Sequence, residues 1–143
     1  MFKYIDLPPV PVFLIEPIND ILAKPVLDTG SKFGYFQSKK VKNELEDWVR
    51  QNISKEGFIQ YQIIMDGIKR HIDGGNRKTA LNYILQTGGK EVYTTHHYPD
   101  GSLMQAVNIQ PFRWHLLKTD ILHTVSGIES ARVSIGIGVN HEW

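Results

Sequence analysis

The chain has 143 residues and no cysteine, with 41% hydrophobic residues, 22% charged residues and a formal net charge of +1. This length and composition predict a single folded domain over residues 1–143. The lack of cysteine excludes a disulfide framework, thiol catalysis and thiolate metal sites. The near-zero net charge argues against nucleic acid as the partner, and no apolar run is long enough for a membrane span. We therefore expect a cytoplasmic protein.

The N-terminal third predicts an extended wrap followed by one helix. Five of the seven prolines lie in the first 30 residues, which favours an outer strand and a wrap over helices. Over Ser38–Ser54 the apolar residues recur at three- and four-residue spacing, which predicts one amphipathic helix. The basic run Ser38–Lys42 would then be a solvated face at the start of this helix.

After Gly57 the pattern changes to short segments, separated by turn residues, that alternate apolar and polar residues or are continuously apolar. The strands predicted from these segments are Phe58–Met65, Lys69–Ile72, Thr79–Gln86, Glu91–His97, Leu103–Gln110, Arg113–Leu117, Ile121–Val125 and Arg132–Val139. Many short strands without alternating helices favour an antiparallel sandwich or barrel. The eight-stranded form that we predict is the jelly roll, or double-stranded β-helix, with the amphipathic helix packed on the outer face of a sheet.

The last predicted strand has two different faces. Its valines and isoleucines alternate with Arg132, Ser134, Gly136 and Gly138, so the two groups lie on opposite faces of the strand. We expect the apolar face to pack on the helix. The opposite face, where glycines leave volume, would line a cavity holding one arginine and one serine.

A second pattern suggests a metal site. In a strand, His71 and Asp73 lie on the same side and can grip one metal ion. This short pattern is common by chance, and it gains weight from His123 and Arg132 on later strands. Two histidines and one carboxylate can hold iron with positions left open for a substrate and O₂. An arginine beyond the metal offers a bidentate fork for the far carboxylate of a dicarboxylic acid, to which Ser134 can add a hydroxyl donor.

Four segments together resemble a known family. They are Met65–Asp73, Arg77–Leu85, His123–Val125 and Arg132–Ser134. They resemble the Fe(II)- and 2-oxoglutarate-dependent oxygenases with a double-stranded β-helix core, and in its compactness the chain is similar to small bacterial and phage members. The resemblance implies a dioxygenase that uses O₂ and couples oxidative decarboxylation of 2-oxoglutarate to hydroxylation of a substrate.

The resemblance also implies roles for particular residues. The implied iron ligands are His71, Asp73 and His123. Arg132 and Ser134 would hold the C5 carboxylate of 2-oxoglutarate, and Asn82 would be a further cosubstrate contact. The chain lacks the long insertions that often cover the substrate in this family. The identity of the substrate is therefore open, with a protein side chain and a small metabolite as candidates. Whether the site is catalytically competent and whether the protein is a monomer or a homodimer are also open.

Two other function classes remain open. A cupin-like metal enzyme would not use 2-oxoglutarate, but its usual His-x-His pair is absent because position 73 is aspartate. A non-catalytic jelly-roll binding module would bind no metal. Among the other histidines, His115 is the rival to His123 as the distal ligand, and its bulky neighbours favour a packed or surface position. We also expect His96 and His97 to be packed or on the surface rather than to line a pocket.

Overall fold

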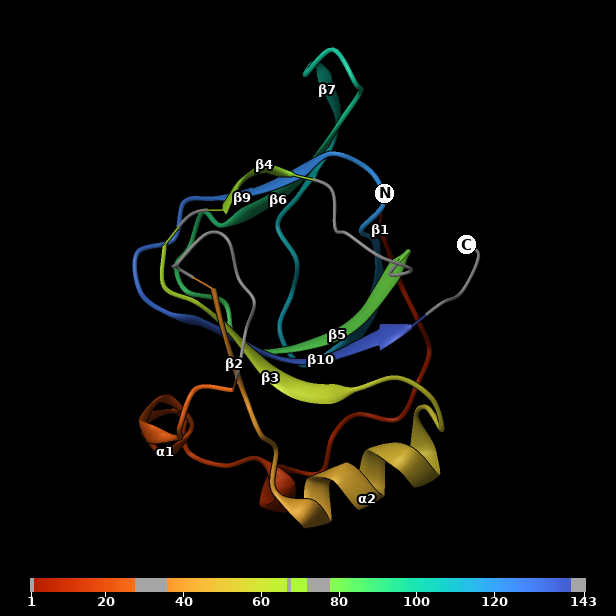
Figure 1. Cartoon of the computed structure of the whole chain (residues 1–143), viewed down its shortest axis with the longest axis vertical. Coiled ribbons are helices and arrows are strands. Elements are labelled where there is room, and N and C mark those ends of the chain that lie inside the picture. The colour runs from red at the N-terminus through yellow and green to blue at the C-terminus, as the bar shows by residue number, and fades with distance from the viewer. Residues whose placement is uncertain (1, 28–35, 67, 72–77, 140–143) are drawn as a thin grey trace.

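The computed structural model describes residues 2–27, 36–66, 68–71 and 78–139 (Figure 1). The protein is mainly β, with two antiparallel sheets and two α-helices in this part of the chain. None of the helices in these ranges is long and apolar enough to cross a membrane.

The larger sheet has six strands. In their order across the sheet they are β1 (Phe2–Tyr4), β8 (Trp114–Lys118), β5 (Thr79–Gln86), β10 (Arg132–Val139), β3 (Ile59–Ile64) and β2 (Phe36–Lys39). Strand β10 is central and pairs with both β5 and β3, so that Ser134 lies between Ile84 on one side and Gln62 on the other.

The smaller sheet has four strands. In their order across the sheet they are β4 (Ile68–His71), β9 (His123–Ser126), β6 (Tyr93–His97) and β7 (Leu103–Val107). From β3 to β10 the chain passes repeatedly between the two sheets, since β3, β5, β8 and β10 belong to the larger one and β4, β6, β7 and β9 to the smaller.

The helical elements lie on the side of the larger sheet that faces away from the smaller sheet (Figure 1). They are the 3-10 helix η1 (Val12–Leu14) and the α-helices α1 (Ile18–Ala23) and α2 (Asn43–Asn52). Leu45 and Val49 of α2 share one hydrophobic core with Val133, Ile135 and Ile137 of β10. The prediction that the apolar face of the last strand packs on the amphipathic helix is therefore confirmed.

The helix predicted over Ser38–Ser54 is shorter than expected and begins only at Asn43. Its first residues lie instead in β2, where they pair with β3. The side chain of Lys39 is buried, and its Nζ atom donates a hydrogen bond to the backbone carbonyl of Leu22. The prediction of a solvated helix face for the basic run is therefore wrong, because strand pairing and this buried contact take precedence over the local periodicity.

The proline-rich start of the chain is partly as predicted. The outer strand is present as β1, at one edge of the larger sheet. The helix α1 was not expected from the sequence. It begins directly after Pro17, whose φ of −55° is typical of proline at a helix start. Proline here precedes the helix and does not interrupt it.

Each of the eight predicted strands has a counterpart between β3 and β10. The largest boundary error is in β7, which ends at Val107 and not at Gln110. The mainly β, antiparallel, two-sheet architecture is confirmed, because alternation of apolar and polar residues reports directly on which residues face a core.

Candidate active site

The space between the two sheets is lined by buried polar side chains. Along β5 and β10 the residues that face the helices are apolar and belong to the main core. Residues on the opposite face alternate with them. Buried polar residues that face this space include Asn82, His115, Arg132 and Ser134 from the larger sheet and Thr94, His96 and His123 from the smaller. We call these seven residues the inter-sheet site.

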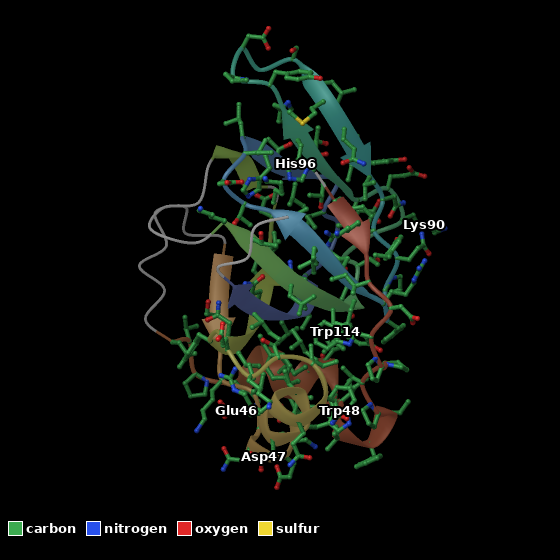
Figure 2. The ribbon with its side chains drawn as sticks, turned by 90° about the vertical axis from the view of Figure 1, so that its right-hand side faces the viewer. Glu46, Asp47, Trp48, Lys90, His96 and Trp114 are labelled. Atoms are coloured by element: carbon green, nitrogen blue, oxygen red, sulfur yellow. The ribbon has the colours of Figure 1, made fainter. Side chains whose placement is uncertain are left out.

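Two hydrogen bonds cross from one sheet to the other at this site. The Nη1 atom of Arg132 lies 3.4 Å from the hydroxyl oxygen of Thr94, and the Nε2 atom of His96 donates to the carbonyl oxygen of Lys118 at 2.8 Å. Figure 2 shows His96 toward the small-sheet end of the molecule and Trp114 toward the helices. A polar interior between sheets is costly to bury and is typical of a binding site.

Arg132 is the most unusual member of this site. Its side chain is 4% exposed, and its Nε atom donates to the carbonyl oxygen of Thr87 at 2.9 Å. The Nη2 atom has no hydrogen-bond partner, and no acidic residue of the described ranges forms an ion pair with the guanidinium. Burial lowers the pKa of Arg132 to about 10, so the side chain stays protonated at pH 7. A buried cation with an open donor is suited to binding an anion.

Ser134 and Asn82 lie on the same face as Arg132. Ser134 is the next residue of β10 on that face and is buried. Asn82 is opposite Gly136 in the pairing of β5 with β10, and its Oδ1 atom is buried without a hydrogen-bond partner. All three residues that the family resemblance assigned to the cosubstrate therefore face the space between the sheets.

The volume beside Gly136 is not open, in contrast to the expectation from the sequence. A Cβ atom at this position would lie 2.6 Å from the Cδ atom of Gln62. The glycine thus makes room for the side chain of Gln62, which belongs to the neighbouring strand β3. Removing a side chain from one strand here allows a longer one from the next strand to fill the space.

Two of the three predicted metal ligands lie on neighbouring strands. The pairing of β4 with β9 sets the Cα atoms of His71 and His123 opposite each other. The Nδ1 atom of His123 donates to the carbonyl oxygen of Ile121 at 2.6 Å. In a neutral ring this leaves the lone pair on Nε2, which is the arrangement found in most metal-binding histidines.

The third predicted ligand, Asp73, lies outside the described residues, as does the side chain of His71. Within the described residues no group of three or more histidine, cysteine or acidic side chains could hold a metal ion. The predicted set of His71, Asp73 and His123 thus stays a prediction, with the pairing of His71 and His123 as its structural support.

His96 is a member of the site that sequence reasoning did not favour. It is opposite His123 in the pairing of β6 with β9, and the two ring centroids are 5.8 Å apart. Burial lowers the pKa of His96 to about 4, so its ring is neutral at pH 7. Because side chains alternate along a strand, the neighbouring His97 lies on the other face of β6, where it forms hydrogen bonds with Gly101 and Thr124.

His115 is buried, in agreement with the expectation of a packed or surface position. It is opposite Asn82 in the pairing of β8 with β5, and the ring of Phe2 lies 5.4 Å from its ring. Its Nδ1 atom has no hydrogen-bond partner. Burial lowers the pKa of His115 to about 4, and the nearby charge of Arg132 acts in the same direction. The bulky neighbours predicted the packing, but only the three-dimensional structure reveals the open nitrogen.

No protein-family model matches the chain, and no curated protein is significantly similar to it in sequence.

Proposed function

We propose that the protein is an Fe(II)- and 2-oxoglutarate-dependent dioxygenase that hydroxylates its substrate. The observation that carries the proposal is the buried guanidinium of Arg132, whose Nη2 atom has no partner in the described part of the chain. A carboxylate suits such a group best, because its two oxygens match the planar N–H donors. The C5 carboxylate of 2-oxoglutarate meets this requirement, and the hydroxyl of Ser134 is on the same face to donate to it.

For the fold, we propose the jelly-roll form of the two-sheet architecture. The larger sheet contains the pairs β3–β10, β10–β5 and β5–β8, and the smaller sheet contains β4–β9, β9–β6 and β6–β7. Counted over the eight strands from β3 to β10, these pairs join the first strand to the eighth, the second to the seventh, the third to the sixth and the fourth to the fifth. This is the pairing in the two Greek keys of a jelly roll. Strands β1 and β2 extend the larger sheet at its two edges.

For the metal, we propose His71, Asp73 and His123 as the ligands. The support is the pairing of β4 with β9 and the hydrogen bond that leaves the lone pair on Nε2 of His123. Bound iron would supply the activation of O₂, which no amino-acid side chain supplies. The sequence has no cysteine, so no thiolate competes for the metal and the fold needs no disulfide, in line with the cytoplasmic location that we propose.

The chain's own residues would then bind and orient the reactants. Arg132 and Ser134 would fix one end of the cosubstrate, and the buried surroundings would keep water away from it. The neutral ring of His96 packs beside His123 and would hold the orientation of that ligand. Asn82 is less suited to the cosubstrate than the resemblance implied, because its open atom, Oδ1, accepts hydrogen bonds and repels a carboxylate.

The test is an anaerobic titration of the purified protein with Fe(II) and then with 2-oxoglutarate. The proposal predicts a weak visible charge-transfer band when the keto acid chelates the iron. The band should be lost in His123→Ala and should need far more 2-oxoglutarate in Arg132→Met. The matched control is His97→Ala, which removes a histidine from the opposite face of the same sheet and should keep the band.

The other outcomes of this titration contradict the proposal in distinct ways. Iron binding without the band, with no effect of Arg132→Met, would favour the cupin-like enzyme. No iron binding by the wild-type protein would favour the non-catalytic jelly-roll module.

A further inference from the structure

Two neighbouring residues of the larger sheet each have a buried hydrogen-bonding atom without a partner, in addition to the open atom of Arg132. These atoms are Oδ1 of Asn82 and Nδ1 of His115. The two residues are directly paired across β5 and β8. Their exposed fractions are 9% for Asn82 and 1% for His115. A buried polar atom without a partner on each of two neighbouring side chains indicates that a ligand group satisfies these atoms.

The chemistry of these two atoms restricts the group that fits. Oδ1 of Asn82 only accepts, so the group must offer an N–H or O–H donor. Nδ1 of a neutral histidine either accepts or donates, depending on which ring nitrogen carries the proton. A primary carboxamide satisfies both cases. One N–H bonds to Asn82, and either its second N–H or its carbonyl oxygen bonds to His115.

Charged groups fit this place poorly. A carboxylate would put its oxygens against Oδ1 of Asn82 without a donor for that atom. An ammonium group would have to leave water for a buried place close to the charge of Arg132, which already disfavours positive charge on His115. A neutral donor group avoids both costs.

We propose that Asn82 and His115 bind a primary carboxamide of the substrate, such as the side-chain amide of asparagine or glutamine. This inference rests on the proposed function only in calling the ligand a substrate, and it assigns Asn82 to the substrate and not to 2-oxoglutarate. The subsite uses none of the proposed metal ligands, so it can be tested without iron.

The experiment uses metal-free full-length protein with ¹⁵N-labelled histidine rings, and it records the ring signals of His115 by NMR. The probes are propionamide, N,N-dimethylpropionamide, propionate and propylammonium. We expect propionamide to shift the His115 signals with an apparent dissociation constant at least about tenfold lower than that of the dimethylated amide, which lacks N–H donors. The shift should persist when 2-oxoglutarate is added at saturation.

The variants test whether the contact is specific. Asn82→Leu keeps a similar side-chain volume and should abolish the preference for propionamide. Ile84→Val is the matched control, since Ile84 lies on the same strand and the same face, and it should keep the preference. Thermal unfolding of both variants checks that they are folded.

Four results would overturn the inference. They are a shift as strong with the dimethylated amide or the charged probes, no shift with any probe, a preference that survives in Asn82→Leu, and loss of the propionamide shift when 2-oxoglutarate is added. Because this experiment contains no metal, its failure is distinct from failure of the iron titration, which tests the proposed function.

Discussion

Asn82 and Leu81 are neighbours in sequence and face opposite sides of the larger sheet. Leu81 belongs to the apolar core on the helix side, whereas Asn82 holds an unpartnered acceptor between the sheets. A residue kept for binding is expected to cost stability, and a core residue to provide it.

This contrast gives a prediction of opposite sign at adjacent positions. Asn82→Leu should leave the free energy of unfolding unchanged or raise it by about 1 kcal/mol, because it removes a buried polar atom without a partner. Leu81→Asn should lower it by about 3 kcal/mol, since it buries a new polar group in the core and removes apolar contacts. Urea unfolding of both variants measures the difference. Equal destabilisation by the two changes would contradict our assignment of the faces.

The buried histidine on β8 makes the stability depend on pH. The pKa of His115 is lowered from its ordinary value of 6.5 to about 4, first by burial. Because the folded state disfavours the charged ring, the stability that this residue contributes is present above pH 6.5 and is lost as the pH falls toward 4.

A variant without a titrating ring should therefore lose less stability in acid. Between pH 7 and pH 4 we expect His115→Leu to lose roughly 2 kcal/mol less than the wild-type protein. Some acid sensitivity should remain, because burial also lowers the pKa of His96. Urea unfolding at both pH values measures this difference. Identical pH dependence of the two proteins would show that His115 does not titrate as described.

At the level of elements, the N-terminal wrap is attached to the larger sheet by a partly buried hydrogen bond. The hydroxyl of Tyr61 on β3 donates to Oε2 of Glu16 at 2.6 Å, and Lys24 forms an ion pair with the other carboxylate oxygen at 3.1 Å. The ion pair joins the two ends of the segment that contains α1, and the hydrogen bond attaches this segment to strand β3. Burial and the contact with Glu16 raise the pKa of Tyr61, which keeps the hydroxyl a donor.

Removing this hydroxyl should weaken the attachment. We expect Tyr61→Phe to lower the free energy of unfolding by about 2 kcal/mol, since the bond is made to a charged acceptor. Tyr93→Phe is the control, because Tyr93 makes the same kind of bond to Glu91 on an exposed part of the chain and should change stability by less than about 0.5 kcal/mol. A similar small effect at both tyrosines would mean that the wrap is held mainly by its apolar contacts.

The elements also show what the sequence could predict. Strands such as β5 and β10 have clear alternation, because one face meets an apolar core and the other a polar space, and both were predicted with the bounds observed. The strand β2 and the buried position of Lys39 were missed, because they depend on pairing with β3 and on a contact with Leu22. Neither partner is adjacent in sequence.

In the inter-sheet site too, features set by local alternation could be predicted from the sequence, and features set by contacts between distant strands could not. Period-two geometry predicted that Arg132 and Ser134 share a face, and this is confirmed by their burial opposite the helix-side core. The roles of His96 and His115 could not be predicted, because these residues meet His123 and Asn82 only across paired strands. Open hydrogen-bonding atoms, which mark the site best, are a property of the folded molecule alone.

In the whole molecule, we propose that the two sheets enclose a metal site and an anion site between them. The most direct measurement is an anaerobic crystal structure of the protein with Mn(II), as an inert substitute for Fe(II), and 2-oxoglutarate. We predict that the metal binds to His71, Asp73 and His123, and that the C5 carboxylate binds to Nη2 of Arg132. A metal bound elsewhere, or a carboxylate that leaves Arg132 without a partner, would contradict it.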